Sequence, residues 1–125
     1  MNLEILKRNI SLHKLGIAEL TGTEKRVYEL LRSNLSELKA YTSETHDAIY
    51  YGKSLDLIII RYNLVTGVLW LKSDEIWSFF RNLSIRDSDI KSFISWWSEM
   101  EMGLNSKLIY QAYGFITPDY SIKMI

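Results

Sequence analysis

The alternation of apolar and polar side chains is clearest between positions 55 and 72. Two arms rich in β-branched and aromatic residues flank a short stretch that contains Asn63, Thr66 and Gly67. β-branched and aromatic residues favour strands, whereas asparagine and glycine suit tight turns. The pattern therefore predicts two antiparallel strands joined by a short loop.

The side chains of this hairpin alternate between two faces. With Tyr62 opposite Val68, Ile60 lies opposite Trp70. One face of the hairpin then carries Ile58, Ile60, Tyr62, Val68 and Trp70. The other face carries Leu57, Ile59, Leu69 and Leu71, interrupted only by Arg61. A hairpin that is apolar on both faces needs cover on both, so we expect helices above and below it and Trp70 in the core.

Apolar residues recur at helical spacing before and after the hairpin. The predicted helices cover about 3–15, about 23–41, about 73–83 and about 87–102. The second of these contains three weak helix formers, Ser33, Asn34 and Ser36, so a break there is the alternative. Ser73, followed by two acidic residues, is the expected N-cap of the third.

The remaining segments complete an α+β fold. The apolar residues at 48–51 predict a third strand of the same sheet, and 120–125 could add an edge strand. The polar stretch 42–47 is typical of a loop, and residues 107–113 fit neither a helical nor a strand period. We expect a single domain over 1–125: a small antiparallel sheet centred on the hairpin, with helices before and after it.

Composition narrows the classes of function. The chain has 15 basic and 15 acidic residues and no cysteine. Because the chain has no basic surplus, we do not expect nucleic acid as a partner. The absence of cysteine excludes disulfides and cysteine zinc sites, and fits a reducing compartment. The chain shows neither a secretory signal nor an apolar stretch long enough to cross a bilayer, so we expect a cytoplasmic protein without membrane contact.

Catalytic motifs are sparse. The only histidines are His13 and His46. Glu44, His46 and Asp47 form the one local cluster of ligand or acid–base groups, and such short clusters are common in solvated loops. We assign no catalytic, metal or cofactor residue, and keep an enzyme with a dispersed site as the third hypothesis.

Residues 20–31 resemble the opening helix of winged-helix DNA-binding domains. In that interpretation 35–41 forms the second helix, 43–54 the recognition helix and the hairpin the wing. The recognition segment carries Glu44 and Asp47 but a single base, Lys53, which is a poor surface for a polyanion. A winged-helix regulator is therefore the alternative function.

The favoured function is a small, non-enzymatic protein-binding module. A neutral, compact chain without a catalytic motif is typical of inhibitors, immunity proteins and phage or mobile-element proteins that modulate a host. Trp77 and Trp96 lie off the middle of their helices' apolar stripes, and Met102 projects away from its own. We expect at least one of the two tryptophans to be exposed and the three residues to form the interface, for another protein or for a second copy of the chain. Trp97 lies within its stripe and belongs to the core.

We predict that folding does not depend on a bound metal, because cysteine is absent and the histidines are not at ligand spacing. Elemental analysis of protein purified without a metal-affinity tag should show no stoichiometric zinc, iron or manganese. A chelator should leave the melting temperature unchanged. A one-to-one metal content would contradict this and point to Glu44, His46 and Asp47.

Overall fold

The computed structural model describes residues 1–43, 48–54, 56–63, 65–66, 68–102 and 122–124. Its elements follow the order α1 (Leu3–Lys14), α2 (Gly22–Leu35), β1 (Lys39–Ser43), β2 (Ala48–Gly52), β3 (Ile58–Asn63), β4 (Leu69–Leu71), α3 (Asp74–Asn82), α4 (Asp87–Met102) and β5 (Ile122–Met124). The α+β class, the helices after the sheet and the third strand agree with the sequence pattern.

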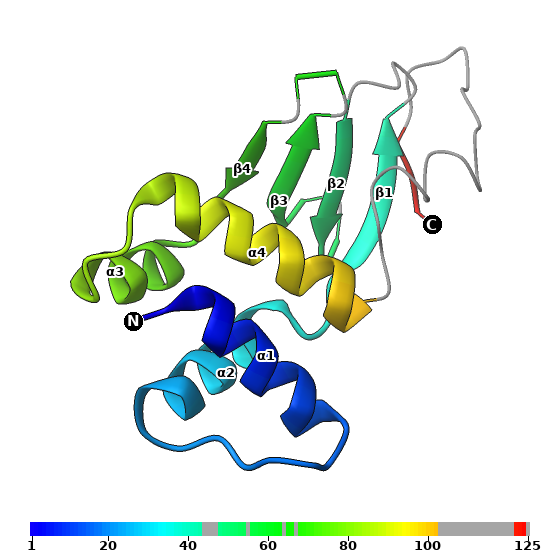
Figure 1. The fold of residues 1–125 in the computed structure, drawn as a ribbon. Helices are drawn as coiled ribbons and strands as arrows, with labels where there is room; N and C mark the ends of the chain where they lie inside the picture. Colours follow the sequence, from blue (N-terminus) through cyan, green and yellow to red (C-terminus); the bar gives the residue numbers. More distant parts are fainter. Residues whose placement is uncertain (44–47, 55, 64, 67, 103–121, 125) are drawn as a thin grey trace.

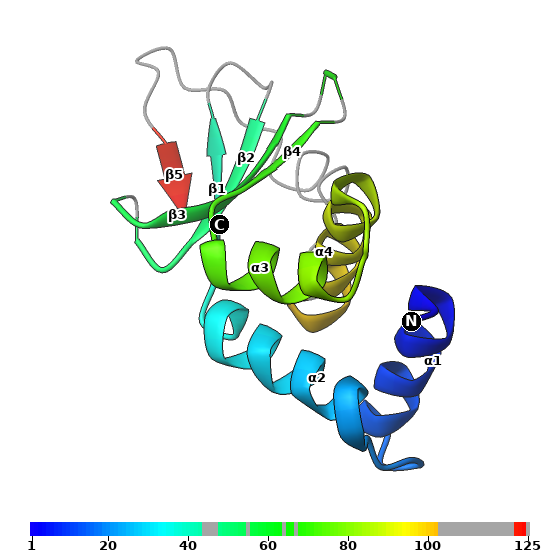
Figure 2. The same cartoon turned by 90° about the vertical axis from the view of Figure 1, so that its left-hand side faces the viewer.

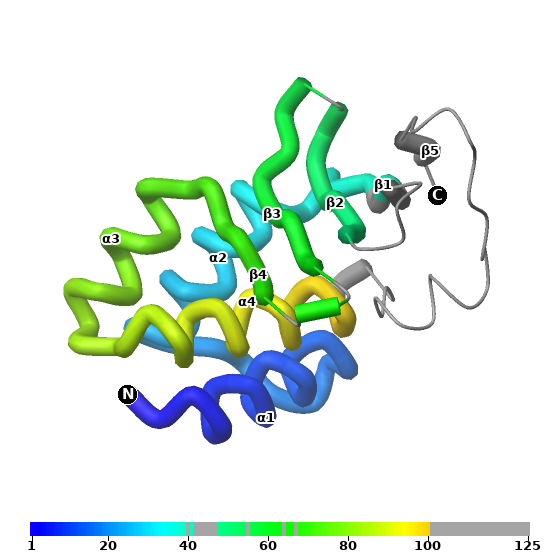
Figure 3. Tube along the Cα trace, turned by 90° about the horizontal axis from the view of Figure 1, so that it is seen from above, coloured from blue at the N-terminus to red at the C-terminus, as the bar shows by residue number. Residues whose placement is uncertain are grey.

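The strands form one antiparallel sheet in the order β4-β3-β2-β1-β5. Figure 1 shows α4 crossing in front of the strands, and Figure 2 shows α4 on one side of them with α2 and α3 beneath. Seen from above, α1 runs alongside α4 (Figure 3). No helix of the described chain lies on the opposite side of the sheet, which we call the uncovered face, so the described residues do not show the expected helical cover on both faces (Figure 2).

The register between β3 and β4 differs by one residue from the predicted register. Tyr62 pairs with Leu69, Arg61 with Trp70, and Ile60 with Leu71. Because side chains alternate along a strand, this shift exchanges the two faces of β4. Trp70 is consequently 49% exposed instead of buried in the core.

The core lies between the inner face of the sheet and the helices. The sheet contributes Ile49, Tyr51, Ile60, Leu69 and Leu71. The helices contribute Leu6, Ile10, Val27, Leu30, Leu31, Leu35, Ile76, Phe80, Ile90, Phe93, Ile94 and Trp97. Trp97 is fully buried and meets the Tyr28 ring edge-on, with 5.7 Å between the ring centroids. The prediction that Trp97 belongs to the core is confirmed.

The helix predicted over 23–41 ends early. Helix α2 stops at Leu35, and the chain then forms β1, so the interpretation of 42–47 as wholly loop is also wrong at its start. Near the helix end, Asn34 Nδ2 and Ser33 Oγ each donate to the carbonyl of Leu30, which offers the backbone an alternative to a further helical turn. Pairing of β1 with both β2 and β5 then favours the extended chain.

Other predicted boundaries are confirmed. Ser73 is the N-cap of α3, and its Oγ accepts a hydrogen bond from the amide of Ile76 at 3.3 Å. Helix α1 ends at Lys14, just before Gly16, whose φ of 75° suits glycine. Strand β5 lies within the predicted 120–125 edge strand. The segment 107–113 lies outside the described residues.

The cap at Ser73 gives a first stability test. Ser73→Ala should lower the free energy of unfolding by about 1 kcal/mol, because the amide of Ile76 loses its acceptor. Ser73→Asp should be nearly neutral, since aspartate also caps and favours the helix N-terminus. Urea unfolding curves measure both values. If both substitutions left the free energy of unfolding unchanged, the Ser73 side chain would not be a stabilising cap of α3.

The observed register gives a second test. Leu71→Ala should destabilise the protein by about 2–5 kcal/mol, because Leu71 is buried under the helices. Trp70→Ala should lower stability by less than about 1 kcal/mol, because this side chain stands on the exposed face. Thermal and urea unfolding of the two variants compare these losses. A larger loss in Trp70→Ala than in Leu71→Ala would support the register predicted from the sequence.

Candidate functional site

A transverse row of side chains crosses the uncovered face of the sheet. Cross-strand pairing joins Trp70 to Arg61, Arg61 to Tyr50, and Tyr50 to Tyr41. Directly paired residues on neighbouring strands point to the same side. Exposure falls along the row from 49% at Trp70 to 4% at Tyr41. The open part of the row therefore lies over β4, β3 and β2.

Arg61 is oriented by the ring beside it. Its guanidinium carbon lies 5.5 Å from the ring centroid of Tyr50, within the range of a cation–π contact. Across the described residues, no carboxylate or hydrogen-bond acceptor is paired with this guanidinium. This contact is not a hydrogen bond, so it leaves the N–H donors of the guanidinium available.

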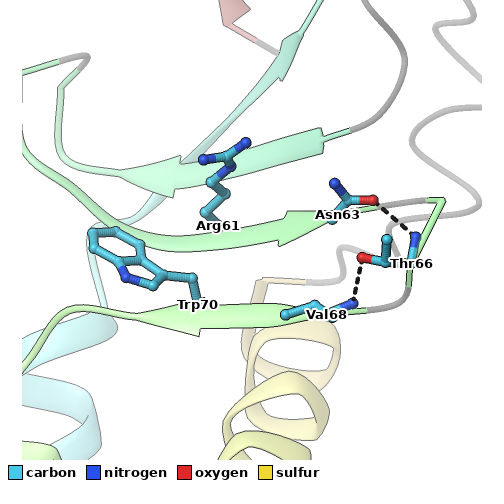
Figure 4. A pocket seen from close by; sticks show the side chains of 5 residues that line it. All are labelled: Arg61, Asn63, Thr66, Val68 and Trp70. Atoms are coloured by element: carbon cyan, nitrogen blue, oxygen red, sulfur yellow. Dashed lines mark hydrogen bonds between the residues drawn. The ribbon is translucent and has the colours of Figure 1, made fainter.

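A shallow hollow of about 350 Å³ opens beside this row at the end of the hairpin. Its lining consists of Arg61, Asn63, Thr66, Val68 and Trp70 (Figure 4), and we call it the hairpin hollow. The side-chain oxygen Oδ1 of Asn63 accepts hydrogen bonds from the backbone amides of Val65 and Thr66, both at 2.9 Å. The asparagine NH2 is left as a donor.

The remaining polar groups of the hairpin hollow are also donors. Thr66 Oγ1 accepts from the amide of Val68 at 3.3 Å and keeps its O–H, while the exposed Trp70 brings an indole N–H. With the Arg61 guanidinium, these groups place a few donors at a hollow whose exposed surface is mostly apolar. Such a lining suits a ligand that combines an apolar group with a hydrogen-bond acceptor.

The charges of the sheet have one sign. The residues in the five strands include no aspartate or glutamate, but they include Lys39, Arg61 and Lys123. The exposed Lys39 lies on the same face as Trp70 by strand alternation, as does the exposed Lys72 immediately after β4. Among the described residues, the charges of the strands on this face are therefore basic, although the whole chain is neutral.

The two tryptophans predicted at the interface are both half-buried, so neither is exposed to the extent expected. Trp77 donates its indole N–H to the carbonyl of Leu71 at 2.8 Å, and the Arg81 guanidinium lies 4.8 Å from its ring centroid. Trp96 packs on Phe93, with 5.4 Å between the ring centroids.

The third interface residue and the local cluster cannot be placed. The side chain of Met102 and the residues Glu44, His46 and Asp47 lie outside the described part of the chain. Trp77 and Trp96 both lie in the helical layer, and neither lines the hairpin hollow.

The other histidine has a structural partner. His13 Nδ1 lies 3.0 Å from the carbonyl oxygen of Ala18, and the ring meets Tyr28 edge-on. Among the described residues, no three His, Asp or Glu side chains come together in a way that could hold a metal ion.

Beneath the sheet, Tyr51 forms a second polar cluster with Tyr62 and Glu99. Burial raises the pKa of the Tyr51 hydroxyl, and the nearby Glu99 carboxylate and Tyr62 raise it further. Tyr51 therefore stays protonated. The cavity beside it measures about 10 Å³, room for about one water molecule, so it admits no substrate.

The sequence pattern missed the row of Trp70, Arg61 and Tyr50. One signal was present: Arg61 is the single charged residue inside two otherwise apolar arms. Its position marks the wet face of β3. The partners opposite it depend on the register, which the apolar pattern of β4 fits equally well in two ways.

The winged-helix interpretation fails on its second and third helices. Residues 35–41 and 43–54 contain the end of α2 and the strands β1 and β2, so the described residues of this segment provide no recognition helix.

No helix in the described residues is both long and apolar enough to cross a membrane. Comparison with models of protein families, with curated proteins and with solved structures gives no match to this chain.

Proposed function

We propose that this chain is a small, non-enzymatic protein-binding module that docks through the uncovered face of its sheet. The observation that carries the proposal is the row formed by the exposed Trp70 and Arg61 and the half-buried Tyr50 beside the hairpin hollow. Tryptophan, tyrosine and arginine are the residue types most enriched in the energetic centres of protein interfaces. Here the three are paired side by side on adjacent strands of a rigid sheet.

The packing of the sheet supports binding rather than catalysis. The described lining of the hairpin hollow has neither a carboxylate nor an imidazole, the groups that most often transfer protons in active sites. Its apolar walls and oriented donors are suited to recognition. A module of this kind acts by covering a partner's surface, as inhibitors and immunity proteins do, and the cysteine-free chain fits action in the cytoplasm.

A capture experiment with Trp70→Ala tests this proposal. The tagged protein should retain a specific protein from a lysate of its source cells, and Trp70→Ala should weaken that complex by about 2 kcal/mol or more, the effect of losing a hot-spot side chain. Calorimetry with the identified partner measures the loss. Leu15→Ala is the matched control, because Leu15 is 72% exposed and lies outside the sheet.

The outcome also separates the two candidate surfaces. Loss of capture in Trp77→Ala or Trp96→Ala, with Trp70→Ala unaffected, would place the interface on the helices and contradict docking through the sheet. Circular dichroism should be recorded for each variant, because Trp77 and Trp96 pack against the core and their truncation lowers stability.

A further inference from the structure

We infer that the partner presents an acidic segment to the uncovered face of the sheet, and that one of its carboxylates enters the hairpin hollow to meet Arg61. This inference rests on the proposed function and deepens it by naming the chemistry of the partner. It is carried by the sign of the charges on the face, by the state of Arg61 and by the donors of the hairpin hollow.

The charges on this face favour an anionic partner. Lys39, Arg61 and Lys72 stand on one face, and the strands contribute no acidic residue to compensate them. Complementary potentials steer association and penalise partners of the same sign. A partner segment with aspartate or glutamate is therefore attracted electrostatically to this face, whereas a basic segment is repelled from it.

The guanidinium of Arg61 is positioned to bind a carboxylate. Contact with Tyr50 holds the guanidinium over the sheet, and its N–H donors have no acceptor among the described residues. A planar guanidinium binds a carboxylate through two parallel hydrogen bonds. The Asn63 NH2 lines the same hollow and can supply a further donor.

The apolar walls of the hairpin hollow favour a partner segment that also carries an apolar side chain. Val68 and Trp70, 54% and 49% exposed, flank the donors. A segment that carries an apolar residue next to its acid covers these side chains when the carboxylate reaches Arg61. We therefore expect the recognised sequence to combine an acid with a neighbouring large apolar residue.

Two other occupants fit the face less well. A second copy of the chain would bring the same basic residues and no strand carboxylate, so the two faces would not complement each other. Single-stranded nucleic acid needs several open aromatic rings for successive bases. Among the described residues of the strands, this face offers Trp70 as its one open ring, because Tyr50 is half-buried under Arg61 and Tyr41 is buried.

Selection from a library of random peptides tests the inference. The full chain is immobilised, and phage-displayed 12-residue peptides are selected on it. Selected peptides should carry aspartate or glutamate beside a large apolar residue. Replacement of that acid by its amide should weaken binding about tenfold or more, which corresponds to ~1.4 kcal/mol.

Matched variants locate the contact. Arg61→Gln should weaken the selected peptides about tenfold or more, and Arg61→Lys should restore only part of the affinity, because lysine lacks the two-donor fork. Arg32→Gln is the control: Arg32 also lies over a tyrosine ring, 5.8 Å from Tyr28, but on α2. It should bind the peptides as the natural protein does.

Several results would contradict an acidic partner. Failure to enrich any peptide, enrichment of neutral or basic peptides, or binding insensitive to Arg61→Gln would overturn the inference. Tighter binding of a fluorescent single-stranded oligonucleotide than of the selected peptides would overturn it in favour of nucleic acid. Self-association lost in Arg61→Gln would overturn it in favour of a second copy.

The same variants separate this inference from the proposed function. A captured protein partner that is lost in Trp70→Ala but retained in Arg61→Gln, with no weakening at higher salt, leaves docking through the sheet intact and overturns the acidic partner. Indifference to Trp70→Ala overturns both.

Discussion

The pairing of β3 with β4 is the constraint on which the rest of the structure depends. Ile60 lies opposite Leu71, and Arg61 opposite Trp70. This register places Leu69 and Leu71 under the helices and turns Trp70 outward. A shift by one residue would bury Trp70 and expose two leucines, because strand side chains alternate with a period of two. The one-sided cover of the sheet and the exposed row both follow from this choice.

Interactions at both ends of the hairpin hold that register. At the loop end, the Asn63 side chain accepts hydrogen bonds from two backbone amides. The backbone N–H of Asn63 donates to the carbonyl of Val68 at 2.8 Å. At the other end, the Trp77 indole donates to the carbonyl of Leu71. Trp77 thus connects the short strand β4 to α3. This hydrogen bond explains why Trp77 lies off the middle of the apolar stripe of its helix.

The fold also separates polar chemistry between its two layers. The described ion pairs lie on the helices and their connections, where Arg81 holds Asp87 through two hydrogen bonds of 2.9 and 2.8 Å and lowers the pKa of that carboxyl. The strands carry bases without acids. Among the described residues, a neutral chain therefore has a sheet with basic side chains beside a helical layer whose charges include ion pairs, and the net charge alone does not reveal this difference. This separation gives the proposed interface its positive charge.

The sequence by itself determined the local elements. Helical spacing, the Ser73 cap and the turn residues of the hairpin located α1, α3, α4, β2 and the β3–β4 hairpin, because each depends on neighbours in the chain. Only the tertiary structure decided where α2 ends and which face of the hairpin is wet. Strand β1 forms through pairing with β2 and β5, partners that no local pattern contains. The apolar residues of β4 satisfy either register, and burial of Leu69 and Leu71 beneath α4 selected the one that leaves Trp70 beside Arg61.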